Sequence, residues 1–544
     1  MKVKYLDYRE LSGQNPLFSR YLYDYDSVDC LYHDPVHLNL DILKQRADLV
    51  ISSPPPFPRD QLVEMTTTFN QKVGAGEETF RNLKKLRSSR AIAVVTGQQT
   101  GFLGGPALTI YKALTAVRLA QILNEEDYCA VPIFWVASDD SDFQEVDSTS
   151  FFDNNGELFP VKYGDPERDR AQMVGTISLK HVEKCMSDLQ ACGPKGEFKE
   201  EVLAILRETY HPTKNFGEAL GSWLSRRFEP YGLVLFDPLM PGYKCGLKSS
   251  FNVAINQRRE IVPTLMKRAE LLREKGLSPQ VKVLESESLI FWTEGKKRYK
   301  LRFEGKGVYE KKTVPSVELS GEELCNALDD EHLSPNVLLR PIVQDHLFPT
   351  VAYVGGPSEV AYFAQVGAIS QFWNQEMAIF PRVGITIVDR KSQRLLKKYG
   401  VHASDFLQLT PEEIAHKAVQ GGDLGKIMGK LSSLQKDVIT QLESLRTDLQ
   451  QADPTVAEML VGSQKKIIYQ IEKMEKRCVA NHRTRTDHFG QHMDYLHSHL
   501  YPEGKYQERI VNFNQFMSEE GASLIKTLME TISPFHLGHH LIYL

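Results

Sequence analysis

The segment AIAVVTGQQTGFLGGPALTIYKALTAVRLA, residues 91–120, constrains the fold more strongly than any other part of the chain. Its first five residues are apolar and partly β-branched, which is typical of a strand buried on both faces. Four glycines follow within nine residues, at Gly97, Gly101, Gly104 and Gly105. Apolar residues then recur at helical spacing, and Pro106 stands where the first turn of a helix tolerates proline. The segment predicts a strand, a tight turn and a helix, the first unit of an α/β fold.

The glycine-rich turn has two interpretations on local features. Glycine lets the backbone approach a ligand closely, and a helix start offers free N–H groups and the positive end of a dipole. The turn could therefore hold the phosphates of a ligand. Its spacing, however, is neither G-x-G-x-x-G nor G-x-x-x-x-G-K-[ST]. A tight connection between strand and helix is the alternative.

Three other apolar segments predict further strands, at 131–137, at 233–236 and at 378–380 with 383–388 beyond it. Helical stretches separate them, which favours parallel strands in an open, doubly wound sheet. Asp139, Asp140 and Asp142 directly follow the strand at 131–137. Ligands of such sheets bind at the carboxyl ends of the strands, so we expect the glycine turn and the aspartates to share one edge. An exposed acidic loop that caps the next helix is the alternative for the aspartates.

A helical hairpin is expected after residue 420. Apolar residues recur at three- and four-residue steps from Leu424 to Leu449 and again from Val456 to Cys478. Between these stripes, Asp453 is suited to an N-cap and Pro454 to the first helical position. Two long stripes around a short break predict an antiparallel pair of helices, which either packs on the body of the protein or protrudes as a coiled coil that pairs with a second subunit.

These patterns divide the chain into seven parts. We predict an N-terminal segment and first half of the core at 1–150, a first insertion at 151–230, a return to the core at 231–274, a second insertion at 275–340 with strands around 281–284 and 298–303, the second half of the core at 341–419, a coiled-coil domain at 420–505, and a C-terminal segment at 506–544 that packs back on the core.

Composition excludes several classes of protein. The 544 residues contain no apolar run of about 18 residues and begin without an apolar signal sequence, so we expect a cytoplasmic protein. A net charge of −5 argues against broad binding to nucleic acid or anionic membranes. Seven scattered cysteines without a C-x-x-C motif favour reduced thiols, and their spacing predicts no zinc or other metal site.

Three motifs in order carry a resemblance to a known family. They are VTGQQ (95–99) with GGP (104–106) and YK (111–112), then PIFWVA (132–137) with DD (139–140) and DF (142–143), then RPIVQ (340–344) with GPSEVAY (356–362). The chain resembles the BshC family, the cysteine ligases of bacillithiol biosynthesis, over essentially its full length. The resemblance implies a Rossmann-like core with two connecting-peptide insertions and a C-terminal coiled coil that mediates homodimer formation. It also implies that the carboxyl group of L-cysteine is joined to the amino group of glucosaminyl malate.

Such a reaction makes defined chemical demands. A carboxylate is a poor acyl donor, so it needs activation, most simply by ATP, with or without Mg²⁺. The amine must lose a proton, which a nearby carboxylate can assist. Asp139, Asp140 and Asp142 are therefore the catalytic candidates. Substrate-binding candidates are Thr96, Gly97, Gln98, Gln99, Lys112, Arg340, Gln344, Ser358, Glu359 and Tyr362. Cofactor-binding candidates are Gly104, Gly105, Gly355 and Gly356.

Some of these residues also have a purely structural interpretation. Lys112 could be a surface lysine, and Arg340 with Gln344 could belong to a structural salt bridge. Ser358 is read as an N-cap, and Glu359 could merely complement a helix dipole. The sequence contains no HIGH, KMSKS or P-loop motif. The expectation of ATP therefore rests on the chemistry of the reaction and on the family resemblance.

One departure from the family pattern concerns the acidic loop. The family usually has Glu-Asp-His-Asp there, whereas this chain has Asp139-Asp140-Ser141-Asp142. Serine cannot replace histidine as a base. Ligation of cysteine to glucosaminyl malate is the leading hypothesis, and a nucleotide-dependent reaction with another amine or amino sugar is the second. A non-enzymatic dimeric scaffold is the third, and the polar residues gathered at two strand ends argue against it.

Overall fold

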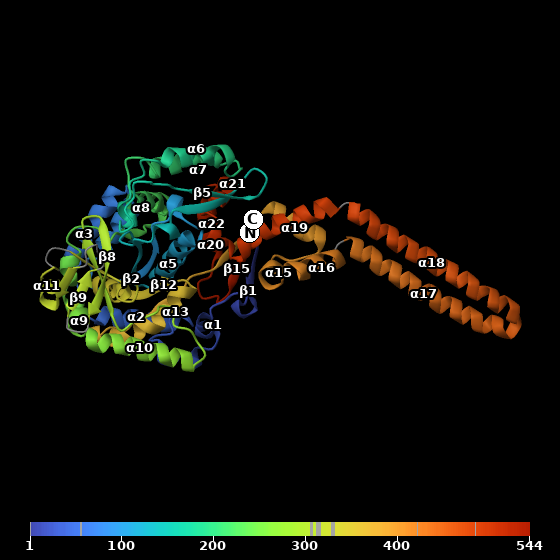
Figure 1. The fold of residues 1–544 in the computed structure, drawn as a ribbon, viewed down its shortest axis with the longest axis horizontal. Coiled ribbons are helices and arrows are strands. Elements are labelled where there is room, and N and C mark those ends of the chain that lie inside the picture. The colour runs from blue at the N-terminus through green and yellow to red at the C-terminus, as the bar shows by residue number, and fades with distance from the viewer. Residues whose placement is uncertain are drawn as a thin grey trace. The chain divides into compact units, whose positions relative to one another are not determined.

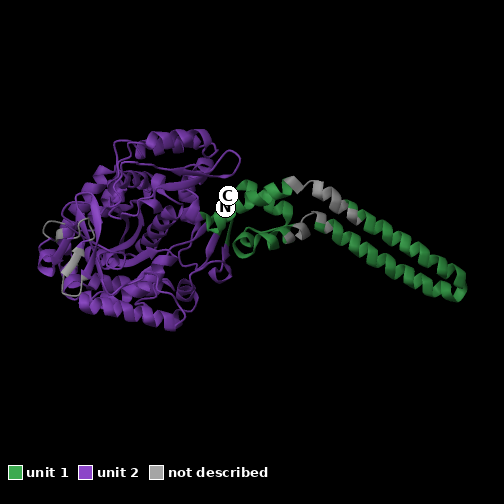
Figure 2. Cartoon of the chain, in the orientation of Figure 1, with its two compact units in different colours: residues 1–4, 386–507, 541–544 green, residues 5–385, 508–540 purple. Residues whose placement is uncertain are grey.

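The computed structural model describes residues 2–54, 57–304, 308–311, 317–327, 332–421, 423–484 and 486–544. The chain forms two compact units (Figure 2). The core unit consists of residues 5–385 and 508–540, and the coiled-coil unit consists of residues 1–4, 386–507 and 541–544. In the described part of the chain, we find no helix of the length and apolar character that crossing a membrane requires.

The centre of the core unit is a five-stranded parallel sheet with the order β13-β12-β2-β3-β6. Its strands are β2 (Ala91–Gln99), β3 (Cys129–Ala137), β6 (Val234–Phe236), β12 (Thr350–Gly355) and β13 (Ile379–Pro381). The chain runs outward from β2 to β3 and β6, then returns to the other side of β2 for β12 and β13. The sheet is therefore doubly wound, as the sequence predicts, and its topological switch point lies between β2 and β12.

Three strand predictions need correction. The segment 383–388, predicted to continue the parallel sheet, instead contains β14 (Ile385–Val388), which belongs to a separate three-stranded sheet. The sequence reading missed β12, although its residues are mostly apolar and all of them are buried. A strand expected at 281–284 is absent from the described structure of that segment. The reason is that Val281 bonds through both its N–H and its carbonyl oxygen to the side-chain amide of Gln365, at 2.8 Å each, instead of joining a strand ladder.

Helices cover both faces of the sheet and connect its strands. α5 follows β2 and packs on β2 and β3, while α13 follows β12 and packs against α10 (Figure 1). α5 begins at Leu108, so Pro106 precedes the helix and does not occupy its first turn. The helices are α1 (Pro16–Tyr23), α2 (Leu40–Ser52), α3 (Arg59–Lys72), α4 (Glu77–Lys85), α5 (Leu108–Glu125), α9 (Lys248–Asn256), α10 (Arg258–Glu274), α12 (Arg340–Leu347), α13 (Pro357–Ile369), α21 (Phe513–Glu520) and α22 (Ser523–Thr531).

Both insertions add small structures to the core unit. The first contains an antiparallel hairpin and helices: β4 (Ser148–Phe152), β5 (Leu158–Lys162), α6 (Val182–Cys192), α7 (Lys199–Thr209) and α8 (Phe216–Arg227). The second forms an antiparallel sheet of order β10-β9-β8-β7-β11 with one short helix. Its elements are β7 (Glu287–Glu294), β8 (Lys297–Glu304), β9 (Val308–Lys311), β10 (Val317–Ser320), α11 (Gly321–Asn326) and β11 (Leu333–Pro335).

Two long helices dominate the coiled-coil unit. α17 (Asp423–Ala452) and α18 (Pro454–Thr484) pack side by side as an antiparallel hairpin, as predicted. Asp453 accepts a hydrogen bond from the N–H of Thr455 at 2.9 Å, which confirms its role as the N-cap before Pro454. The side chains of Leu424 and Cys478, which end the predicted stripes, lie outside the described residues.

Shorter elements complete the chain. They are α14 (Arg390–Tyr399), α15 (Ala403–Gln408), α16 (Pro411–Gly421), α19 (Thr486–Leu500), α20 (Gln507–Ile510), and the strands β1 (Lys2–Leu6), β14 (Ile385–Val388) and β15 (His539–Tyr543) of a three-stranded sheet.

Candidate active site

A cavity of about 700 Å³ opens in the core unit at the carboxyl edge of the parallel sheet. The ends of β2 and β3, the start of α13 and residues of the second insertion line it. Cavities of this size hold small molecules, and in doubly wound sheets ligands bind at the switch point. Predicted site residues among its lining are Gly97, Gln98, Gln99, Lys112, Asp139, Asp140, Arg340, Gly356, Ser358, Glu359 and Tyr362.

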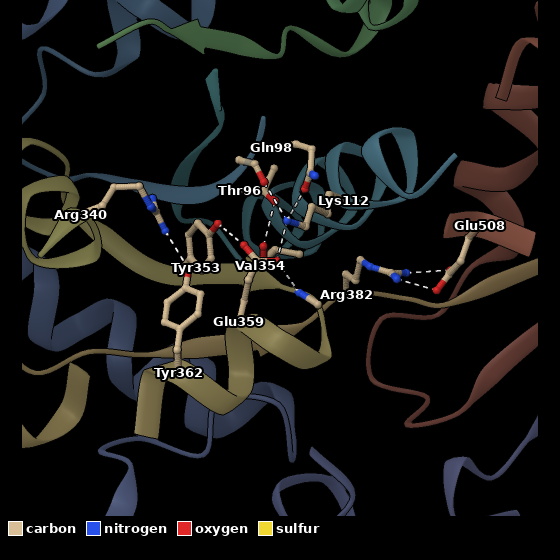
Figure 3. A network of polar contacts seen from close by, with 12 residues as sticks. Thr96, Gln98, Lys112, Arg340, Tyr353, Val354, Glu359, Tyr362, Arg382 and Glu508 are labelled. Carbon is tan, nitrogen blue, oxygen red and sulfur yellow. Dashed lines mark hydrogen bonds and ion pairs between the residues drawn. The ribbon is translucent and has the colours of Figure 1, made fainter. Parts of the chain in front are cut away.

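Lys112 and Glu359 form a buried ion pair that connects the two halves of the sheet at the switch point (Figure 3). Lys112 Nζ lies 2.5 Å from Glu359 Oε2, and the lysine side chain is 4% exposed. Burial would raise the pKa of Glu359, but the charge of Lys112 and the N–H of Gly356 hold that pKa below its ordinary value. Burial lowers the pKa of Lys112. The alternative prediction that Lys112 is a solvated surface residue is therefore wrong.

The start of α13 is capped differently from the prediction. Gly356 is the N-cap, and Glu359 at the third helical position accepts a hydrogen bond from its N–H at 2.7 Å. Ser358 therefore lies inside the first turn and not at the cap, with its side chain exposed among the cavity residues. Glu359 also accepts a hydrogen bond from the Tyr353 hydroxyl at 2.5 Å. It therefore does more than complement the helix dipole, because it also bonds to a group outside the first turn of α13.

The two glutamines at the end of β2 make contrasting contacts. Gln98 accepts a hydrogen bond from Lys112 Nζ through Oε1 at 2.9 Å. Gln99 donates from Nε2 to Asp140 Oδ2 and to Glu145 Oε2, both at 2.7 Å. Each glutamine is thus held by charged neighbours at the edge of the cavity.

The three aspartates of the acidic loop have different surroundings. Asp139 is 9% exposed, lines the cavity and has no hydrogen-bond or ion-pair partner among the described residues. Asp140 is held by Gln99 and by the N–H of Ser141 at 2.7 Å. Asp142 is exposed and is not among the lining residues. Of the two aspartates that line the cavity, Asp139 is the one without a protein partner among the described residues.

Asp237 is a buried carboxyl group that sequence reasoning did not select. It follows β6, the neighbour of β3, and accepts hydrogen bonds from the Ser138 hydroxyl and from the N–H of Leu239. Burial raises its pKa from 3.8 to about 6, and the nearby charge of Asp139 acts in the same direction. The sequence signal that could have identified Asp237 is an apolar strand followed directly by an acidic residue.

The raised pKa of Asp237 predicts a pH dependence of stability. The folded state binds this proton more tightly than the unfolded state, so the stabilisation is present below about pH 4 and is lost as the pH rises through about 6. Relative to Asp237→Asn, the free energy of unfolding of the wild type should fall by roughly 3 kcal/mol between pH 4 and pH 7. Urea denaturation of both proteins across this range measures the difference. A constant difference would contradict the assignment.

Arg340 occupies a pocket of aromatic rings and hydroxyl groups. Its guanidinium lies 4.8 Å from the centre of the Tyr353 ring and donates to the Tyr362 hydroxyl at 3.2 Å (Figure 3). It also donates to Gln344 Oε1 at 3.0 Å. Gln344 is fully buried and is not among the lining residues, so it contacts Arg340 on the side away from the cavity.

Thr96 is likewise buried, and its hydroxyl donates a hydrogen bond to the carbonyl oxygen of Val354.

Protein groups surround the glycine turn that follows β2. Gly104 has a φ of 92°, its N–H donates to the Tyr210 hydroxyl at 2.6 Å, and an added Cβ would come within 2.6 Å of the Trp223 ring. Asn512 donates to the carbonyl oxygen of Gly105 at 2.9 Å. Neither glycine is among the lining residues, and neither is Gly355. The cofactor-binding role of Gly104, Gly105, Gly355 and Gly356 stays a prediction.

Several cavity residues come from parts of the chain where sequence reasoning named no site. Lys282, Arg298 and Lys300 belong to the second insertion. Arg382 directly follows β13, and Arg509 belongs to α20. Arg298 lies 3.8 Å from Asp140 and covers the ring of Phe291 at 3.9 Å. Their only signal was charge, which is common on surfaces. The described lining contains no histidine, so the position of Ser141 is not compensated by an imidazole there.

A doubly wound sheet with a polar cavity at its switch point defines an α/β enzyme that acts on a small molecule. The chain belongs to the BshC family: residues 1–383 match "Bacillithiol biosynthesis BshC, N-terminal Rossmann-like domain" and residues 385–544 match "Bacillithiol biosynthesis BshC, C-terminal coiled-coil domain". The resemblance, the Rossmann-like core, the coiled coil and the ligase class expected from the sequence are thereby confirmed.

Curated relatives share nearly the full length of the chain. Proteins named "Putative cysteine ligase BshC" are 31% identical in Solibacter usitatus, covering 96% of both chains, and 31% identical in Koribacter versatilis, covering 87% of this chain and 88% of the relative. The one from Chlorobaculum tepidum is 30% identical and covers 100% of both.

Proposed function

We propose that this chain is a cytoplasmic ligase that joins the carboxyl group of L-cysteine to the amino group of glucosaminyl malate. Family membership supports the reaction class. The observation that carries the proposal is a cavity that offers an unpartnered carboxylate, Asp139, on one wall and cations of the second insertion on another. A cavity that binds a substrate with an ammonium group and carboxylates must offer both negative and positive side chains.

Asp139 is the residue that we assign to the amine. Its carboxylate would hold the acceptor ammonium and take the proton that the nitrogen must lose before it attacks the acyl carbon. No neighbouring side chain among those described competes for its oxygens. This assignment gives the chain a base without the histidine that Ser141 replaces.

ATP is the co-substrate that we propose for activation of the carboxyl group, because a carboxylate has no good leaving group of its own. Its phosphates need cationic partners. Lys282 and Lys300 in the cavity are suited to that task, and Lys282 has no partner among the described residues. Lys300 is already paired with Glu287 at 3.0 Å, which leaves Lys282 as the first choice.

The direct test is mass spectrometry of the purified protein with cysteine, glucosaminyl malate and ATP. Bacillithiol together with AMP or ADP is the expected product set, and the nucleotide distinguishes an adenylate from a phosphate route. The absence of any product with precursors of proven quality would refute the proposal. Products formed only with other amines would favour the second hypothesis from the sequence.

We further propose that α17 and α18 pair with a second copy of the chain. Their apolar stripes remain partly uncovered, and exposed members include Ile427, Leu434, Leu445, Val456, Met459, Ile467 and Met474. A hairpin that used all its apolar side chains internally would leave fewer of them in water. Replacing Leu434, Leu445 and Met459 with glutamate should convert a dimer into a monomer in light scattering. A wild-type monomer would contradict this expectation.

A further inference from the structure

Gln98 and Gln99 are adjacent at the end of β2, yet groups of opposite charge hold their side-chain amides. An ammonium group can only donate hydrogen bonds, so Lys112 must face the amide oxygen of Gln98. Carboxylates can only accept, so Asp140 and Glu145 must face the amide nitrogen of Gln99. The orientation of both amides therefore follows from the charge of their partners, which removes the usual ambiguity between amide oxygen and nitrogen.

Lys112 has no hydrogen left for a ligand. Its three protons are directed to the carbonyl oxygen of Gly97 at 2.8 Å, to Gln98 Oε1 at 2.9 Å and to Glu359 Oε2 at 2.5 Å. Glu359 is in turn held by Tyr353 and Gly356 (Figure 3). Lys112 therefore cannot bind a substrate directly without giving up a buried contact, and its influence on the cavity passes through Gln98.

These contacts determine which hydrogen-bonding groups the two glutamines offer at the edge of the cavity. The Gln98 amide nitrogen has no partner among the described residues, and this side chain lines the cavity. Its two N–H groups are thus available as donors, whereas the side-chain oxygen of Gln99 has no hydrogen-bond partner among the described residues.

We propose that Lys112 is a positioning residue which, together with Glu359, fixes Gln98 as a hydrogen-bond donor to a carboxylate oxygen of the substrate. The inference rests on the proposed function in one respect, because that function supplies the carboxylate. The carboxylate has two possible sources, the cysteine and the malyl group, and the experiment separates them.

The test uses Gln98→Glu, which keeps the side-chain length and still gives Lys112 an acceptor, but replaces the donor with a negative oxygen. Calorimetry measures the dissociation constants of two matched ligand pairs, L-cysteine with L-cysteinamide and L-malate with L-malamide. The variant should weaken the carboxylate member of one pair by at least about tenfold and leave its amide member unchanged. The pair that responds identifies the source. Unchanged ratios in both pairs, or no binding of either carboxylate to the wild type, would overturn the proposal.

A second variant tests Lys112 itself. Lys112→Met combined with Glu359→Gln removes both buried charges together, which avoids leaving one of them unpaired. Without the ammonium group, the Gln98 amide can turn, so the preference for carboxylate over amide should fall by at least about threefold in the same pair. A purely structural role would weaken both members equally and leave the ratio constant, which would overturn the positioning role. Both experiments measure ratios of dissociation constants. If the protein failed to catalyse ligation, the proposed function would be refuted, but these ratios would not change.

Discussion

Asp139→Asn is expected to lower kcat/KM for ligation by about 10²- to 10⁴-fold, the range over which a positioned general base contributes. The reason is local: Asp139 is nearly buried, lines the cavity and has no partner among the described residues. Asparagine keeps the shape but cannot take a proton from the acceptor amine. Steady-state kinetics with saturating cysteine and ATP measure the loss.

Asp142→Asn is the matched comparison for this prediction. It makes the same chemical change three residues further along the loop, at an exposed position outside the cavity lining. We expect its activity to stay within about threefold of the wild type, as is usual for surface substitutions. The assignment of the base to Asp139 would be wrong if Asp139→Asn kept more than a tenth of the wild-type activity, or if both variants lost activity equally.

Glu508→Gln is expected to destabilise the core unit by about 3–5 kcal/mol. Glu508 and Arg382 form a two-point ion pair at 2.5 and 2.8 Å with side chains that are 5% and 3% exposed (Figure 3). Glu508 also accepts a hydrogen bond from the N–H of Ile385. Glutamine would leave the Arg382 charge buried without its counter-ion. Urea denaturation followed by tryptophan fluorescence reports the change.

Two further variants make this measurement specific. Glu530→Gln removes the same charge from an exposed pair with Lys526 at 4.0 Å, and it should produce no measurable change. Arg382→Met combined with Glu508→Met removes both buried charges and should recover most of the loss. Equal stability of Glu508→Gln and Glu530→Gln would show that burial does not strengthen the pair.

Much of the architecture is predictable because it depends on local patterns. The apolar run before Thr96 and the run before Asp139 both became buried parallel strands, and the broken stripe around Asp453 became a helical hairpin. β12 was missed although the shorter run at 233–236 was predicted as a strand, because a short apolar run by itself does not distinguish a strand from a buried helix segment. The strand expected at 281–284 failed because a single side chain, Gln365, bonds its backbone instead.

The sequence by itself determined the fold class, the family and the set of polar residues from which a site could be built. It could not separate Asp139 from Asp142, nor a surface lysine from the buried Lys112, because residues close in the chain can differ completely in burial. Only the tertiary structure brought β12 beside β2 and so placed Glu359 against Lys112. Burial and pairing depend on contacts between distant segments, and in this protein those contacts decide which charges remain available to a ligand.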